Sequence, residues 1–194
     1  MKSTSQFRCG LAAALIVLII SACSDSGMGD RVLAARPEGG DFVLQSAAGP
    51  VDTRALRGNV LLVYFGYLNC PDVCPISMAA GAAALNALTP AERARTKMIM
   101  ISVDPERDTP AKLKEYAAYF HPEMIGVVGS AEQTVVVARS FGAGYVRQPA
   151  RPDGGYAVDH GSQTFVVGPD GKLMGLLPLG VLTDQVVAAV RKLL

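Results

Sequence analysis

Two cysteines, Cys70 and Cys74, are separated by three residues and directly follow an apolar segment, 59–65, that is typical of a buried β-strand. Two thiols at this spacing can close a disulfide or hold one soft metal ion. A third soft ligand, His160, lies far downstream in a Val-Asp-His-Gly run. The chain has only four cysteines and two histidines, so few other constellations are possible.

The elements around these residues decide what the thiols can do. A proline suits the first helical position, so we expect a helix over 75–88, with Cys70 and Cys74 in the turn before it. The positive end of the helix dipole would favour the thiolate there. His160 ends a predicted strand, 156–159, and is expected to approach from a neighbouring loop. Two sulfurs and one nitrogen suit Cu(I) better than zinc, which prefers four ligands in structural sites.

Other interpretations of the cysteine pair stay open. The pair can act in a thiol–disulfide oxidoreductase or redox sensor without metal, although thioredoxin-like proteins usually carry two residues between the cysteines rather than three. It can also form a purely structural disulfide. A peroxidase of the thioredoxin superfamily is disfavoured, because Asn69 and Pro71 flank Cys70 and no Thr-x-x-Cys run appears.

The start of the chain, 1–22, has the pattern of an export signal. Lys2 and Arg8 make a positive beginning, 11–20 is an unbroken apolar run, and small residues precede Cys23. The apolar run is too short to cross a bilayer of about 30 Å comfortably as a helix. Small residues followed at once by cysteine resemble a bacterial lipobox, which implies cleavage before Cys23 and a lipid on its sulfur and new amino terminus. The alternatives are an ordinary signal peptide or a short uncleaved anchor.

Export defines the environment of the remaining residues. Segment 23–40 has no sustained apolar period and is typical of a flexible tether, and 41–194 is one domain's worth of chain. We expect this domain to be lipid-anchored to a bacterial membrane and to face the periplasm or the cell exterior, an oxidising compartment. The chain has 18 Lys and Arg residues and 17 Asp and Glu residues. Removal of the export signal takes away Lys2 and Arg8 and leaves 16 basic against 17 acidic residues. A net charge this close to zero does not support nucleic-acid binding.

Within 41–194 the pattern alternates between strands and helices. Strands are expected at 42–44, 50–53, 59–65, 97–103, 124–128, 156–159, 163–167 and 173–177, and helices at 75–88, 110–120, 131–141 and from 183 to the C-terminus. Segment 142–155, which holds Gly, Pro and Arg, is expected to be an exposed loop. This order predicts an α/β fold with an N-terminal hairpin, in which parallel strands place functional groups at their carboxyl ends.

Several runs jointly resemble the Sco/SenC family. They are 66–75 (Gly-Tyr-Leu-Asn-Cys-Pro-Asp-Val-Cys-Pro), 104–110 (Asp-Pro-Glu-Arg-Asp-Thr-Pro), Asp159-His160 and the Gly-Pro-Asp-Gly turn at 168–171. The family consists of membrane-tethered copper proteins that help to build the binuclear copper A centre of cytochrome c oxidase. The resemblance implies a thioredoxin-like fold, with a central mixed sheet flanked by helices. This sequence departs from the family pattern at Leu68-Asn69, where Thr-His is common, and at Gly161, where Ser or Thr is common.

The resemblance also implies that Cys70, Cys74 and His160 are copper ligands, for Cu(I), Cu(II) or both. The reduced cysteines would hold copper and release it by ligand exchange to cytochrome c oxidase subunit II or another cuproprotein. A copper-donating chaperone and a thiol reductant protein are expected partners, because the compartment pushes thiols toward the disulfide. The protein is then a metallochaperone rather than an enzyme, with thiol–disulfide reduction as an alternative role of the cysteine pair.

Two further features remain hypotheses at this stage. Asp159 is a candidate hydrogen-bond partner for the imidazole of His160, although adjacent strand residues point to opposite faces. The run 104–110 is explained by the loop that begins a helix, with Asp108 or Thr109 as its cap, so we assign it no chemistry.

Overall fold

The computed structural model describes residues 37–194. The predicted signal peptide, the predicted lipidation site Cys23 and most of the predicted tether lie outside the described residues. Among the described residues, none of the helices has the length and apolar character needed to cross a membrane. The carbonyl of Glu38 accepts a hydrogen bond from Leu173 N, and Gly39 N donates to Ser140 O, so the last residues of the predicted tether are bound to the domain.

A hairpin precedes the main sheet. Its antiparallel strands are β1 (Val43–Ser46) and β2 (Gly49–Asp52), and a short 3-10 turn, η1 (Thr53–Leu56), follows. The side chain of Asp52 accepts a hydrogen bond from Arg54 N and so caps this turn. The hairpin confirms the N-terminal extension that the sequence predicted.

The central sheet has five strands in the order β5-β4-β3-β8-β9. Their bounds are β3 (Val60–Gly66), β4 (Thr96–Ser102), β5 (Ile125–Val127), β8 (Thr164–Val167) and β9 (Leu173–Leu177). Strands β3, β4 and β5 run parallel, whereas β8 is antiparallel to β3 and β9 is antiparallel to β8. The two inner parallel strands are buried almost throughout, which explains their continuous apolar sequences.

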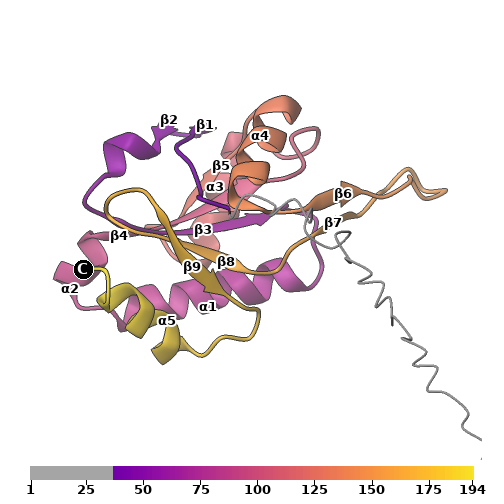
Figure 1. Cartoon of the computed structure of the whole chain (residues 1–194). Coiled ribbons are helices and arrows are strands. Elements are labelled where there is room, and N and C mark those ends of the chain that lie inside the picture. The colour runs from indigo at the N-terminus through magenta and orange to yellow at the C-terminus, as the bar shows by residue number, and fades with distance from the viewer. Residues whose placement is uncertain (1–36) are drawn as a thin grey trace, which may run out of the picture. The chain divides into compact units, whose positions relative to one another are not determined.

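Helices cover both faces of this sheet (Figure 1). They are α1 (Val73–Ala87), α2 (Pro90–Ala94), α3 (Pro110–Phe120), α4 (Ala131–Phe141) and α5 (Thr183–Arg191). Helices α1 and α5 lie on one face, and α4 lies on the other with the β1–β2 hairpin (Figure 1). On the α4 face, the ring of Phe141 packs edge-on against Phe65 at 5.6 Å and Phe165 at 5.5 Å. Since side chains alternate along a strand, Tyr64 faces the opposite side, toward α1.

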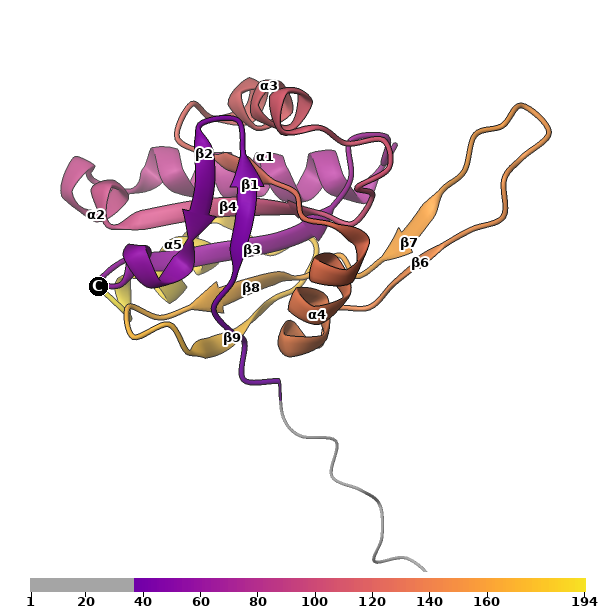
Figure 2. The same ribbon diagram turned by 90° about the horizontal axis from the view of Figure 1, so that it is seen from above.

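Three parts of the structure differ from the sequence prediction. Helix α1 begins at Val73, so Cys74 lies in its first turn rather than before it. Helix α2 was not predicted, although Thr89 and Glu92 form a capping box with a proline inside the first turn. The predicted loop 142–155 contains β6 (Tyr145–Arg147), which pairs with β7 (Val158–His160) in a separate two-stranded ladder. Figure 2 shows this β6–β7 hairpin extending away from the central sheet.

The sheet gathers three segments at one edge. Parallel strands β3 and β4 end side by side, with Gly66 paired with Ser102, so the segments that follow them are neighbours. Strand β8 runs the other way and begins at the same edge, where Thr164 pairs with Tyr64. The segment that leads into β8 carries His160. The cysteine loop 67–72, the segment 103–109 and the end of β7 therefore meet at the carboxyl end of β3.

Candidate metal centre

The three predicted ligands come together at this edge. One ligand atom from each of Cys70, Cys74 and His160 lies within 4.8 Å of the others. Cys74 Sγ is 3.4 Å from His160 Nε2. Both thiols are free and buried, with Cys70 9% and Cys74 0% exposed. Cys70 is placed by a turn in which its amide donates to the carbonyl of Tyr67, and Cys74 by the first turn of α1.

The imidazole of His160 is oriented by the backbone of the next residue, Gly161. Nδ1 lies 2.8 Å from the carbonyl oxygen of Gly161. Because a carbonyl only accepts hydrogen bonds, Nδ1 carries the proton and donates it. In the neutral ring, Nε2 then holds the lone pair, and the thiol of Cys74 donates to this nitrogen with Sγ at 3.4 Å. A nitrogen in this state is ready to bind a metal ion.

Two tyrosines complete the surroundings of these ligands. The hydroxyl of Tyr64 donates to Cys74 Sγ at 3.6 Å. The ring of Tyr67 stands edge-on to the imidazole at 5.6 Å and 88°, and Tyr64 does the same at 6.1 Å and 83°. The donor role of Tyr64 could not be predicted from the sequence, because that role depends on α1 packing over β3.

Burial controls the charge state of the thiol at Cys74. It raises the pKa of Cys74 to about 12, while hydrogen bonds from the Tyr67 backbone and the Tyr64 hydroxyl act in the opposite direction and are weaker. The prediction that the helix start would favour a thiolate is therefore wrong for Cys74. Its side chain is completely buried, and desolvation outweighs the hydrogen bonds that favour the thiolate. A bound cation supplies the charge that a thiolate needs in such surroundings.

The donor set fits copper. Two sulfurs and one imidazole nitrogen are soft or intermediate ligands, and the group is small and largely shielded from water. Cu(I) accepts two or three such ligands. The same geometry brings the two thiols together, as a redox-active pair also requires.

Asp159 is not the hydrogen-bond partner of the imidazole in this structure. Its carboxylate accepts a hydrogen bond from Gln148 Nε2, at 2.5 Å, while His160 bonds to the carbonyl of Gly161. The alternation of side chains along β7 explains the separation, since neighbouring residues of a strand point to opposite faces.

The run 104–110 supports the cysteine loop. Asp108 is 3% exposed, and its Oδ2 accepts hydrogen bonds from Ser102 Oγ at 2.6 Å and from the amide of Leu68 at 3.2 Å. Leu68 lies two residues before Cys70, so Asp108 fixes the approach to the first ligand. The sequence of this run predicts only the start of a helix, and Thr109 does cap α3. The parallel order of β3 and β4 was the signal that could have placed the run beside the cysteines.

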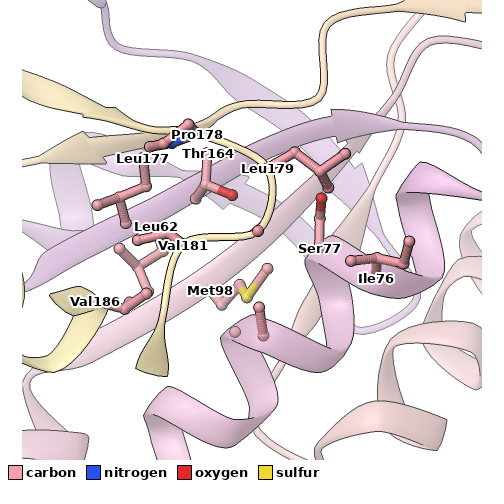
Figure 3. A pocket seen from close by; sticks show the side chains of 13 residues that line it. Leu62, Ile76, Ser77, Met98, Thr164, Leu177, Pro178, Leu179, Val181 and Val186 are labelled. Atoms are coloured by element: carbon pink, nitrogen blue, oxygen red, sulfur yellow. The ribbon is translucent and has the colours of Figure 1, made fainter. Parts of the chain in front are cut away.

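An apolar pocket opens beside α1, shortly after Cys74 (Figure 3). Ile76 and Ser77 line one side, and Leu179 and Val181 of the segment before α5 line another (Figure 3). The lining contains no Cys, His or carboxylate side chain. The pocket is therefore separate from the group of ligating atoms.

Comparisons with known proteins agree with this arrangement. A family model described as SCO1/SenC matches residues 31–194. The apo Sco1 protein of Thermus thermophilus is 40% identical, with a TM-score of 0.75, over 82% of this chain and 94% of that one. Bradyrhizobium japonicum ScoI with copper bound is 33% identical, with a TM-score of 0.74, over 81% and 99%.

A third solved structure is BsSco, described as having a disulfide switch and as a member of the Sco family of cytochrome c oxidase assembly proteins. It is 29% identical, with a TM-score of 0.64, over 81% of this chain and 93% of that one. These likenesses and the mixed sheet flanked by helices confirm the predicted thioredoxin-like α/β fold. The chain belongs to the SCO1/SenC family.

Proposed function

We propose that this protein binds one copper ion through Cys70, Cys74 and His160 and delivers it to the copper A centre of cytochrome c oxidase. The observation that carries the proposal is the convergence of the three ligand atoms within 4.8 Å. The proposal is supported by a solved relative, B. japonicum ScoI, that has copper bound. Subunit II of the oxidase is the proposed acceptor, and a copper-donating chaperone is the proposed source.

Binding and release follow from the protonation and redox states of the thiols. A buried, protonated Cys74 gives up its proton when copper arrives, and the ion is exchanged onto the acceptor's ligands when that protein docks. Oxidation of the pair removes two electrons and two protons and forms a sulfur–sulfur bond, which leaves no thiolate for copper. The disulfide must receive two electrons from a thiol reductant protein before the site can load again.

Attachment to a membrane is a further part of the proposal. It depends on the export signal over 1–22 and on a lipid at Cys23, both of which are features of the sequence. A lipid anchor would hold the domain near a membrane-bound acceptor and so raise the effective concentration of copper at its target.

Anaerobic titration of the reduced protein with Cu(I) and with Cu(II) tests the copper site. X-ray absorption should count two sulfur neighbours and one nitrogen, at one copper per chain. We expect Cys70→Ala, Cys74→Ala and His160→Ala each to remove the corresponding neighbour. His121→Asn is a matched control, because His121 lies outside the ligand group. Full copper retention with two sulfur neighbours in Cys70→Ala would refute this site.

A thiol–disulfide oxidoreductase is the second candidate function. It is favoured by the closeness of the two thiols and by the disulfide switch described for BsSco. This function needs both cysteines but not the imidazole. Under it, His160→Ala would keep disulfide reduction and normal oxidase copper content, whereas either cysteine variant would lose both. Under the copper function, His160→Ala lowers the copper content of the oxidase.

A further inference from the structure

The β6–β7 hairpin carries His160 but is not part of the central sheet. Its strands pair only with each other among the described residues, and Figures 1 and 2 show that it extends away from the sheet. In contrast, Cys70 lies in the loop that follows the carboxyl end of the central strand β3, and Cys74 lies at the start of α1. Contacts outside the strand ladders must therefore hold the imidazole beside the thiols.

Tyr156, two residues before β7, provides the first of these contacts. It is 7% exposed, and its hydroxyl donates to Asp104 Oδ1 at 2.7 Å. Its ring lies against two guanidinium groups, with Arg107 Cζ 3.6 Å and Arg147 Cζ 3.9 Å from the ring centroid. Cations at such distances over an aromatic ring are attracted to its face. The loop-side end of the β6–β7 ladder is therefore fastened to the segment that follows β4.

Arg107 extends this connection to the cysteine loop. Its Nη1 donates to the carbonyl of Tyr156 at 2.9 Å, and its Nε is bonded to the carboxylate of Asp104, which is 3% exposed. The same guanidinium lies 5.7 Å from the ring centroid of Tyr67. Tyr67 packs edge-on against His160 and lies three residues before Cys70. One arginine thus contacts the hairpin, the segment after β4 and the cysteine loop.

The pair formed by Arg147 and Glu106, at 2.9 Å, adds a weaker contact. Both side chains are more than half exposed, so water and salt screen their attraction. The contacts through Arg107 and Tyr156 are more buried and include several hydrogen bonds. They therefore contribute more to the position of the hairpin than the exposed Arg147–Glu106 pair does, together with the burial of Val158 in the core.

We infer that Arg107 and Tyr156 are positioning residues that hold His160 within reach of the two thiols, an inference that rests on the proposed copper function. Neither residue belongs to the ligand group. Their contacts determine whether the nitrogen is available as the third ligand. Two thiolates alone satisfy Cu(I), whereas Cu(II) requires more ligands and prefers nitrogen and oxygen. Loss of the positioning contacts therefore weakens Cu(II) binding more than Cu(I) binding.

Two variants separate this role from a general loss of stability. Tyr156→Phe removes only the hydroxyl, and Arg107→Gln removes the guanidinium. Arg107→Lys is not expected to restore binding, because an ammonium cannot reproduce the fork that contacts Tyr156 and Asp104 together. Arg191→Gln is the control. It breaks an exposed pair with Glu92, and Figure 1 shows α5 and α2 on the side of the domain away from β6 and β7.

The first measurement compares the affinities of the full-length, reduced protein for the two copper ions. We expect Arg107→Gln to lower Cu(II) affinity by about 10–100-fold, with a smaller change for Tyr156→Phe. Nitrogen hyperfine coupling in the Cu(II) electron paramagnetic resonance spectrum should weaken in the same order. Cu(I) affinity should change much less, and Arg191→Gln should match the wild type in all three measurements.

The second measurement needs no metal. Hydrogen exchange of the copper-free protein should become faster at backbone amides of the β6–β7 hairpin in both variants, while β3 keeps its protection. Unchanged exchange at the hairpin together with unchanged nitrogen coupling would overturn the inference. If the wild type bound no copper, the proposed function would fail, and the exchange result would still decide whether Arg107 and Tyr156 hold the hairpin in place.

Discussion

Cys74 Sγ and His160 Nε2 lie 3.4 Å apart although the two residues are 86 positions apart in the sequence. The antiparallel pairing of β8 with β3 creates this relationship, because it returns the chain to the edge at which the cysteine loop begins. The hydrogen bond from Nδ1 to Gly161 then turns the lone-pair nitrogen toward the sulfur. The three proposed ligands thus lie close together in the folded chain, an arrangement that would reduce the ordering cost of metal binding.

The closeness of β3 to Cys74 leads to a first prediction. A Cβ atom at Gly66 would lie 2.7 Å from Cys74 Sγ and 2.8 Å from Tyr64 Cε1. We expect Gly66→Ala to lower the free energy of unfolding by about 1–3 kcal/mol, because overpacking forces neighbouring groups to shift. Displacement of Cys74 should also lower the copper bound per chain. Chemical denaturation and metal analysis measure the two effects.

Gly175→Ala is the matched control for this variant. An added Cβ there meets no atom within 4 Å, and Gly175 also lies in a strand of the central sheet. It should keep both stability and copper. Wild-type copper content and an unchanged denaturation midpoint in Gly66→Ala would show that the contact at Cys74 is not restrictive.

The support given by Asp108 leads to a second prediction. Asp108→Ala leaves the amide of Leu68 and the hydroxyl of Ser102 without their acceptor, and each unsatisfied group costs about 1–3 kcal/mol if it stays buried. The freed loop should expose Cys70, so alkylation of this thiol in the metal-free protein should become faster. Asp108→Asn keeps an acceptor oxygen and should lie close to the wild type. Equal alkylation rates in the Ala and Asn variants would contradict a role for this carboxylate in fixing the loop.

The buried thiol leads to a prediction about pH. Burial raises the pKa of Cys74 to about 12, so the thiol of the metal-free protein is protonated at neutral pH. Protons compete with copper below this pKa, and the apparent Cu(I) affinity therefore rises with pH, by about tenfold per unit for each proton released. Competition against a chelator of known Cu(I) affinity at several pH values measures the slope. An affinity that does not vary with pH would mean that the thiol is already ionised.

The unexpected helix α2 leads to a prediction about stability alone. The hydroxyl of Thr89 accepts from Glu92 N, and the carboxylate of Glu92 accepts from Thr89 N and Arg191. Thr89→Ala should lower the free energy of unfolding by about 1 kcal/mol through loss of the cap, with no change in copper binding. Thermal and chemical denaturation test the first part, and copper titration tests the second.

The hydrogen bonds to the carboxylate of Glu92 also determine the pH below which they stop stabilising the fold. The hydrogen bond from Arg191 and that from Thr89 N lower the pKa of Glu92 to about 2. The folded-state pKa of Glu92 lies below the unfolded value of about 4.3. The stabilisation by the ionised Glu92 side chain is therefore fully present at pH values above about 4.3. It is lost as the pH falls toward about 2. The difference in stability between the wild type and Glu92→Gln should therefore shrink in acid. A difference that stays constant down to the acid range would contradict this account.

Much of the fold followed from local sequence. The apolar runs of β3 and β4 predict strands covered on both faces, because only such strands can do without alternating polar residues. The cap at Thr109 and the turn at 168–171 also depend on near neighbours in the chain. The β6–β7 ladder could not be predicted in the same way. Its pairing joins Tyr145 to His160 across a long loop, and the sequence between them indicates only flexibility.

The sequence by itself determined which side chains offer soft ligands, since Cys70, Cys74 and His160 have few alternatives in this chain. Only the tertiary structure decided their state and their partners. Burial, more than any hydrogen bond to the sulfur, controls the pKa of Cys74. A backbone carbonyl, not Asp159, orients the imidazole. Ligand type is a property of one residue, whereas desolvation and hydrogen-bond direction depend on segments that are distant in the chain and meet only when the sheet forms.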